Sequence, residues 1–281
     1  MGTAYESVAT HRSGQDGAAW RSGEGDLQVT VLSVLALIVA GFGAGLIGST
    51  AGLASLVSYP ALLAFGLPPV LANVTNTTGI TFFTIGSVVS TRPELGGTWR
   101  RLWPRIALFL VFGALGAWLL VHSPPGSFEA VVPWLIAFAS VLLIFREQVQ
   151  NASMRAGKQL RSAGVGFWIV LALIATYGGY FGAAAGVILL AWLMLTTDDD
   201  LAYCAAEKNV LLGASNLAAA IGFIFISDIH WGAAACIAVG GIVGAYVGPK
   251  VLRKIPERPM RLVIGLLGLG LAVKLFMDSL G

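Results

Sequence analysis

Lys208 has the clearest chemical meaning of any side chain in this sequence, because it lies about seven residues into an apolar segment that begins at Leu201. In a helix, this is roughly 10 Å from the start of the segment. A lysine at the centre of a bilayer costs about 2.5 to 3.5 kcal/mol on insertion scales, so something should compensate its charge. A bound anion would do so; the alternatives are an ammonium that reaches the membrane surface or one that pairs with Glu207. Neighbouring helix residues do not face each other, which argues against Glu207 but leaves the membrane surface open.

Neutral hydrogen-bonding side chains lie at a matching depth in both halves of the chain, and they suit an oxyanion. The first half contributes Asn73, Thr75, Asn76, Thr77 and Thr78, and the second half contributes Asn209, Ser215 and Asn216. Serine and threonine in membrane helices often bond back to their own helix, so the cluster carries more weight than any one member. The substrate-binding residues that we predict are Lys208, Asn209, Asn73, Thr75, Asn76, Tyr177, Tyr180 and Asn216.

Other reactive side chains have simpler interpretations. Tyr177 and Tyr180 lie in a glycine-rich stretch, where they either close a cavity or only contribute to packing. The three aspartates at 198–200 are interpreted as the start of the next helix, with one of them as its N-cap, in preference to a cation site. His122 and His230 fall in predicted loops and are not placed to act as ligands.

The composition indicates a protein that lies in a membrane. Hydrophobic residues make up 57% of the chain and charged residues 11%, and the mean hydropathy is +0.82, which does not fit a water-soluble surface. The net charge of +3 comes from loops and points to anionic lipid, not to nucleic acid. The sequence contains no His-Glu-x-x-His, Gly-x-Ser-x-Gly or acidic metal motif, so we predict no enzyme activity, no metal site and no cofactor.

Loop charges predict the topology, because short loops rich in Lys and Arg stay cytoplasmic. Basic residues place the loops at 92–105, 146–161 and 250–261 inside, and their absence places 121–131 and 227–230 outside. Two apolar segments are too long for one crossing: 165–195 would measure roughly 46 Å as a helix and 29–65 roughly 55 Å, against a hydrocarbon core of about 30 Å. We therefore expect a bend at membrane depth in each segment, around 178–186 and 41–52. The residues assigned to the bends are Gly48, Gly52, Gly182 and Gly186.

The two halves overlay in apolar pattern. When 49–72 is laid over 183–206, Gly52 meets Gly186 and Thr75 meets Asn209. In each pair of equivalent loops only one is rich in Lys and Arg. Equivalent loops therefore lie on opposite sides of the bilayer, and the repeats are predicted to be inverted. The predicted fold is an all-α polytopic membrane protein with two inverted repeats, each a broken or re-entrant helical hairpin followed by three transmembrane helices. The boundaries are a polar disordered tail at 1–28, a first repeat at 29–147, a cytoplasmic linker at 148–163 and a second repeat at 164–281.

Several stretches resemble one family of permeases. These are GAGLIGSTAG at 43–52, ANVTN at 72–76, YGGYFGAAAG at 177–186, AEKNVLLG at 206–213, and a PKVLRKIP loop at 249–256 before the last helix. Together they resemble the sulfite exporter TauE/SafE-like permeases over nearly everything after residue 29. The first-half motif departs from the usual glycine-rich pattern at Ser49, Thr50 and Ala51. The resemblance implies a permease for small sulfur-containing or organic anions, such as sulfite, sulfonates or sulfoacetate.

We therefore expect a multi-pass transporter of the cell membrane that acts on a small anion and binds no nucleic acid, with its oligomeric state left open. Export is favoured, since a monovalent anion gains about 2.3 kcal/mol per 100 mV on leaving an inside-negative cell. Concentrative uptake would need a coupling ion, for which Glu207 is the one obvious carboxylate within the predicted spans. Proton-coupled uptake, an anion channel and a scaffold without transport remain the alternatives.

Overall fold

The computed structural model describes residues 31–124, 126–156, 164–252 and 257–278. Within these ranges the chain is helical and contains no β-strand. The tail predicted at 1–28 lies outside the described residues, as does the end of the predicted linker, at 157–163. The linker itself begins as helix α7 (Arg146–Ala156).

The order of helices is the same in the two halves. The first half contains α2 (Val31–Ala51), α3 (Ser55–Ala64), α4 (Pro69–Ser90), the 3-10 helix η1 (Arg92–Leu95), α5 (Trp99–His122) and α6 (Ser127–Ile144). The second half contains α8 (Val165–Tyr180), α9 (Ala185–Thr196), α10 (Leu201–Ile226), α11 (Trp231–Leu252) and α12 (Glu257–Asp278). Each half is thus a segment broken into two helices and followed by three unbroken ones, which agrees with the predicted order.

Local sequence explains where helices α4 and α10 begin. The Asp200 carboxylate accepts a hydrogen bond of 2.7 Å from the Tyr203 N–H and caps α10, as the aspartates predicted. Pro69 begins α4, a position where the missing N–H of proline costs nothing. The prediction that residues 92–105 form a loop was wrong in its second part, because α5 already begins at Trp99 and includes Arg105. Arg105 is buried there, with 8% of its surface exposed.

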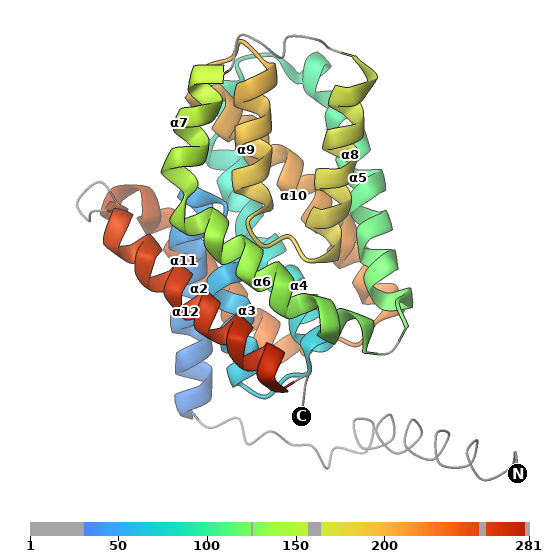
Figure 1. Cartoon of the computed structure of the whole chain (residues 1–281), viewed down its shortest axis with the longest axis vertical. Coiled ribbons are helices and arrows are strands. Elements are labelled where there is room, and N and C mark those ends of the chain that lie inside the picture. Colours follow the sequence, from blue (N-terminus) through green and yellow to red (C-terminus); the bar gives the residue numbers. More distant parts are fainter. Residues whose placement is uncertain (1–30, 125, 157–163, 253–256, 279–281) are drawn as a thin grey trace, which may run out of the picture.

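The two breaks lie in the interior, where Figure 1 shows the loop between α8 and α9 in the middle of the molecule. Gly52 follows α2 with φ +70°, and Gly182 follows α8 with φ +72°, a region that glycine enters without strain. The first break falls only at the end of the predicted stretch 41–52, because α2 stays helical to Ala51. Gly48 and Gly186 are therefore helical and flank the breaks instead of forming them.

Glycines inside the helices serve close packing. Helix α2 packs on α11, and α8 packs on α5. A Cβ atom on Gly240 would lie 2.0 Å from the Ile38 carbonyl oxygen, and one on Gly116 would lie 2.1 Å from that of Thr176. Backbones approach this closely only where a side chain is absent, as at small-residue faces of membrane helices.

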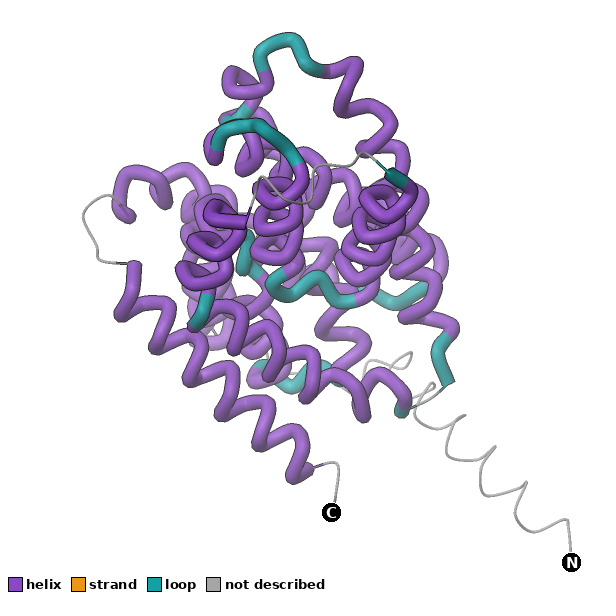
Figure 2. The backbone as a smooth tube through the Cα atoms, turned by 45° about the horizontal axis from the view of Figure 1, so that its top comes forward, coloured by secondary structure: helices purple, strands orange, loops and turns teal. Residues whose placement is uncertain are grey.

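The remaining contacts build a single bundle. Helices α4 and α10 contact each other, as do α6 and α12. Helices α6 and α12 run obliquely across the front of Figure 1. The tube in Figure 2 shows how short the connections between the described helices are. Four of those helices are long and apolar enough to cross a membrane by themselves: 31–48 within α2, and α5, α6 and α10. The chain therefore has the features of a membrane protein, whereas the opposite orientation of its halves stays a prediction.

Candidate functional site

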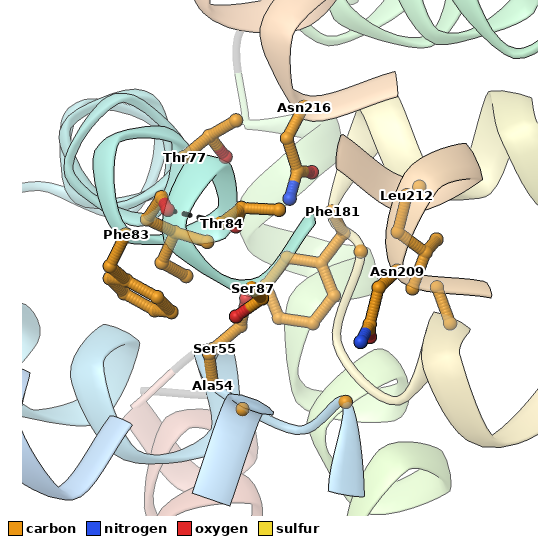
Figure 3. Close-up of a pocket in the computed structure, with 16 residues that line it drawn as sticks. Ala54, Ser55, Thr77, Phe83, Thr84, Ser87, Phe181, Asn209, Leu212 and Asn216 are labelled. Atoms are coloured by element: carbon orange, nitrogen blue, oxygen red, sulfur yellow. Dashed lines mark hydrogen bonds between the residues drawn. The ribbon is translucent and has the colours of Figure 1, made fainter. Parts of the chain in front are cut away.

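A cavity of about 60 Å³ lies between the two breaks and the central helices. Its wall comes from both halves of the chain: the ends of α2 and α8, the starts of α3 and α9, one face of α4 and one face of α10. The lining residues with polar side chains are Ser55, Thr77, Thr84, Ser87, Asn209 and Asn216. In Figure 3, Asn209 and Asn216 on α10 lie across from Thr77, Phe83 and Thr84 on α4. At about 10 to 15 Å³ for each water molecule, the cavity has room for about four to six waters or one small oxyanion.

The two breaks touch each other beside this cavity. A Cβ atom on Gly52 would lie 3.0 Å from the Gly186 Cα, and one on Gly186 would lie 2.8 Å from the Gly52 carbonyl oxygen. Residues that are equivalent in the sequence overlay thus meet backbone to backbone in the fold. Any side chain at either position would push the two broken segments apart.

Four of the lining side chains have polar groups available to a ligand. Among the described residues, the hydroxyls of Ser55 and Thr77 and the amides of Asn209 and Asn216 make no hydrogen bond, and none of these groups is fully enclosed. The Thr84 hydroxyl differs, since it donates to the Ile80 carbonyl at 2.9 Å within its own helix. The available groups include amide and hydroxyl donors, which is what an oxyanion requires.

The helix starts at the breaks add backbone donors. Helices α3 and α9 begin at Ser55 and Ala185, both of which line the cavity. The N–H groups of Ser55 and Gly186 donate no backbone hydrogen bond within the described part of the chain. Helix N-termini carry partial positive charge as well as such unpaired N–H groups. Both features favour an anion.

Lys208 lies directly behind the first break. Only 1% of its surface is exposed, and its Nζ is 3.3 Å from where a Cβ of Gly52 would be. It has no hydrogen-bond or ion-pair partner among the described residues. Neither alternative from the sequence therefore holds, because the ammonium does not reach the surface and Glu207 pairs elsewhere. Glu207 is fully buried and forms an ion pair with Arg105 of α5.

The other predicted site residues lie away from the cavity wall and contact protein groups. Asn73 Nδ2 donates to the Tyr180 carbonyl at 2.8 Å, and the Tyr177 hydroxyl donates to the Ala183 carbonyl at 2.6 Å. The Thr75 hydroxyl oxygen accepts from the His230 N–H at 3.1 Å.

Asn76 and the Tyr180 ring complete this group. Asn76 is fully buried, and neither polar atom of its amide has a partner. The Tyr180 ring packs edge-on against Phe128, with 5.7 Å between ring centroids. Of the eight predicted binding residues, Asn209 and Asn216 line the cavity and Lys208 lies beside it, whereas the remaining five hold neighbouring segments or stand apart.

Sequence reasoning missed Arg105 and Ser55. Arg105 was counted with a loop, although its position six residues after Trp99, inside an apolar run, is a signal for a buried arginine. Ser55 gave no signal of its own, because its role depends on where α2 ends. No group of three or more His, Cys, Asp or Glu residues in the described ranges could hold a metal ion.

Comparison with known proteins identifies the family. The model described as sulfite exporter TauE/SafE matches residues 37–275. The chain belongs to this family. Among its relatives are a probable membrane transporter protein of Haemophilus influenzae, 23% identical over 90% of this chain and 98% of that protein, and the probable membrane transporter protein YfcA of Escherichia coli K12, 24% identical over 85% and 87%.

A third relative, the probable membrane transporter protein ORF9 of Sinorhizobium sp, is 25% identical over 86% of this chain and 92% of that protein. No solved structure significantly matches the chain. The sulfite exporter TauE/SafE family is one of membrane transporters, and the resemblance predicted from the motifs is confirmed.

Proposed function

We propose that this chain is a permease of the plasma membrane, not an enzyme, and that it carries small sulfur-containing or organic oxyanions of the sulfite and sulfonate type. The observation that carries the proposal is the unpaired, buried ammonium of Lys208 beside the cavity. Leaving a buried charge without a partner is costly, so a site that keeps one is matched to a ligand of opposite charge.

The surroundings of Lys208 support the same ligand class. Arg105 and Glu207 neutralise each other, so their pair leaves the charge of Lys208 uncompensated. The cavity offers neutral donors and two helix N-termini, and its volume suits an anion of a few heavy atoms. Larger sulfonates would require the two breaks to separate.

Alternating access is the proposed mechanism. Helix α2 packs on α11 while α8 packs on α5, and in the sequence overlay these two pairs are equivalent. Two halves with equivalent contacts are what inverted repeats use to exchange inward-open and outward-open states around a fixed site. The contact between Gly52 and Gly186 lies where the halves would move against each other.

Export is the proposed direction. Glu207, the carboxylate that could carry a coupling proton, is ion-paired with Arg105 and so already has a counter-charge. The membrane potential alone supports an outward gradient of about fiftyfold per 100 mV for a monovalent anion. Proton-coupled uptake stays a second candidate because the Glu207 Oε2 atom has no hydrogen-bond partner. Flux that follows an imposed pH gradient in the native protein, and not in Glu207→Gln, would favour uptake.

The test is flux of labelled sulfite and methanesulfonate into proteoliposomes under an imposed potential. Lys208→Met is compared with Lys274→Met, which removes a lysine that is exposed on α12. We expect saturable, potential-sensitive flux in the native protein and in Lys274→Met, and a loss of at least about tenfold in Lys208→Met. Equal flux in both variants would contradict the role of Lys208, and no flux of either anion in the native protein would contradict the substrate class.

A further inference from the structure

The ion pair next to Lys208 has no part in holding the ligand, yet it lies close to the site. Arg105 on α5 and Glu207 on α10 are both buried, and the Arg105 guanidinium also lies over the Phe167 ring at 5.0 Å from its centroid. Glu207 directly precedes Lys208, and Asn209, the next residue, lines the cavity. Residues two positions apart face nearly opposite sides of a helix, so the pair lies about one helix diameter from the cavity, roughly 10 to 12 Å.

A second ion pair joins α5 to the residues just before α10 and serves as an internal comparison. Arg101 on α5 donates two hydrogen bonds, of 2.9 and 2.7 Å, to the Asp199 carboxylate just before α10. The Arg101 side chain is 43% exposed, so water screens this pair. The two pairs join the same parts of the fold, and they differ in burial.

Burial determines how strongly each charge changes the affinity of the cavity for an anion. Between buried groups an effective dielectric constant of about 20 applies, and a unit charge about 10 Å away then changes the affinity for a monovalent anion by about tenfold. For a divalent anion the same charge changes the affinity by about a hundredfold. Each unit of charge at the pair thus changes the ratio of divalent to monovalent affinity by about tenfold.

We propose that the Arg105–Glu207 pair sets the charge selectivity of this site, by keeping its positive charge low enough to favour singly charged over doubly charged oxyanions. The proposal rests on the proposed anion site. Lys208 supplies the charge that attracts the ligand, and Glu207 cancels the charge that Arg105 would otherwise add. Arg146 at the start of α7, the other buried cation near Lys208, takes part in further interactions of its own.

The experiment compares two anions of similar size whose charge does not change near neutral pH. Methanesulfonate is the monovalent probe and sulfate the divalent one, each measured as an inhibitor of labelled sulfite flux in proteoliposomes. The ratio of the two inhibition constants is determined for the native protein, Glu207→Gln, Arg105→Gln, the double variant, Arg105→Lys and Asp199→Asn.

We expect Glu207→Gln to shift the ratio about tenfold toward sulfate and Arg105→Gln to shift it about tenfold toward methanesulfonate. The double variant leaves no unpaired buried ion at the position of the pair, which is the costly case, and should keep the native ratio. Arg105→Lys retains the positive charge and should also keep the native ratio of the two inhibition constants. Asp199→Asn breaks the solvent-screened pair with Arg101 and should shift the ratio by less than about twofold.

The outcomes separate this proposal from the one on which it rests. Saturable flux with a ratio that stays constant in both folded single variants would overturn the role of the pair and leave the anion site intact. A changed ratio in the double variant or in Arg105→Lys would overturn it too, since it would show that the pair acts through structure and not through charge. If neither anion inhibits flux in the native protein, the anion site itself is wrong.

Discussion

The segments ANVTN on α4 and AEKNV on α10 occupy equivalent positions in the two halves, yet their polar side chains have different surroundings. On α4, Asn73 and Thr75 bond to backbone groups of other segments, the Tyr180 carbonyl and the His230 N–H. On α10, Glu207 and Lys208 are buried charges, and Asn209 faces the cavity. The repeat supplies two similar positions. In this chain Asn73 and Thr75 of the first bond to other segments, whereas the second contributes Asn209 to the cavity wall and Lys208 beside it.

The contact that joins the two halves gives the largest expected effect. Gly52→Ala places a methyl group 3.0 Å from the Gly186 Cα, at a residue whose φ of +70° already disfavours alanine. Gly186→Ala places one 2.8 Å from the Gly52 carbonyl oxygen. We expect either variant to lower the thermal stability by several degrees and to reduce flux by more than about tenfold, measured by unfolding in detergent and by proteoliposome flux.

Gly86→Ala on α4 is the matched control, because a Cβ atom there meets nothing within 4 Å. Helix propensity alone predicts that this change stabilises the protein by up to about 1 kcal/mol. If Gly52→Ala and Gly86→Ala behave alike, the breaks do not form the close contact on which the site depends.

A second pair of variants tests the difference between α4 and α10 at overlaid positions. Asn209→Leu removes an unpaired amide from the cavity wall, and since a hydrogen bond to a charged group contributes about 1.5 to 3 kcal/mol, we expect a loss in anion affinity of about tenfold or more. Thr75→Val removes the acceptor for the His230 N–H and should instead lower stability by about 1 kcal/mol. Affinity is measured by inhibition of flux and stability by thermal unfolding.

The opposite pattern, with affinity lost in Thr75→Val and kept in Asn209→Leu, would mean that the ANVTN segment contacts the ligand and AEKNV does not. Equal losses of affinity in both would mean that the ligand spans the two helices, as the sequence alone predicted.

Periodic apolar runs and their lengths were sufficient to predict the order of elements. The excess length of 165–195 required a break, and the glycines at 178–186 indicated its position. The first break was harder to locate, because Gly41 and Gly45 have the same composition signal but pack against α11, where Cβ atoms would lie 2.5 Å from the Ile237 and 2.1 Å from the Gly241 carbonyl oxygens. Whether a glycine breaks a helix or lets another helix approach depends on tertiary contacts.

The sequence predicted some of the residues at the cavity and missed or misplaced others. Residue type pointed to Lys208, Asn209 and Asn216, which lie at or beside the cavity, since a charge or amide at membrane depth needs a partner. It could not separate Asn209 from Asn73, because the partner of Asn73 is a carbonyl 107 residues away in the sequence. Arg105 was missed for the same reason, as its partner Glu207 lies on another helix and is 102 residues away.

The smallest expected effect concerns Asn76, the polar residue of the ANVTN segment whose amide contacts no hydrogen-bond partner. Both polar atoms of its amide are buried without a partner, and an unsatisfied buried polar group costs about 1 to 3 kcal/mol. Asn76→Leu replaces the amide with an apolar group of similar volume, so we expect stability to rise by up to about 1 kcal/mol in thermal unfolding, with flux unchanged. A loss of flux without a gain in stability would show that the amide binds the substrate in a state in which it has a partner. In that case the ANVTN segment would contribute to transport as well as to stability, and its contrast with AEKNV would apply to one state of the cycle and not to the protein as a whole.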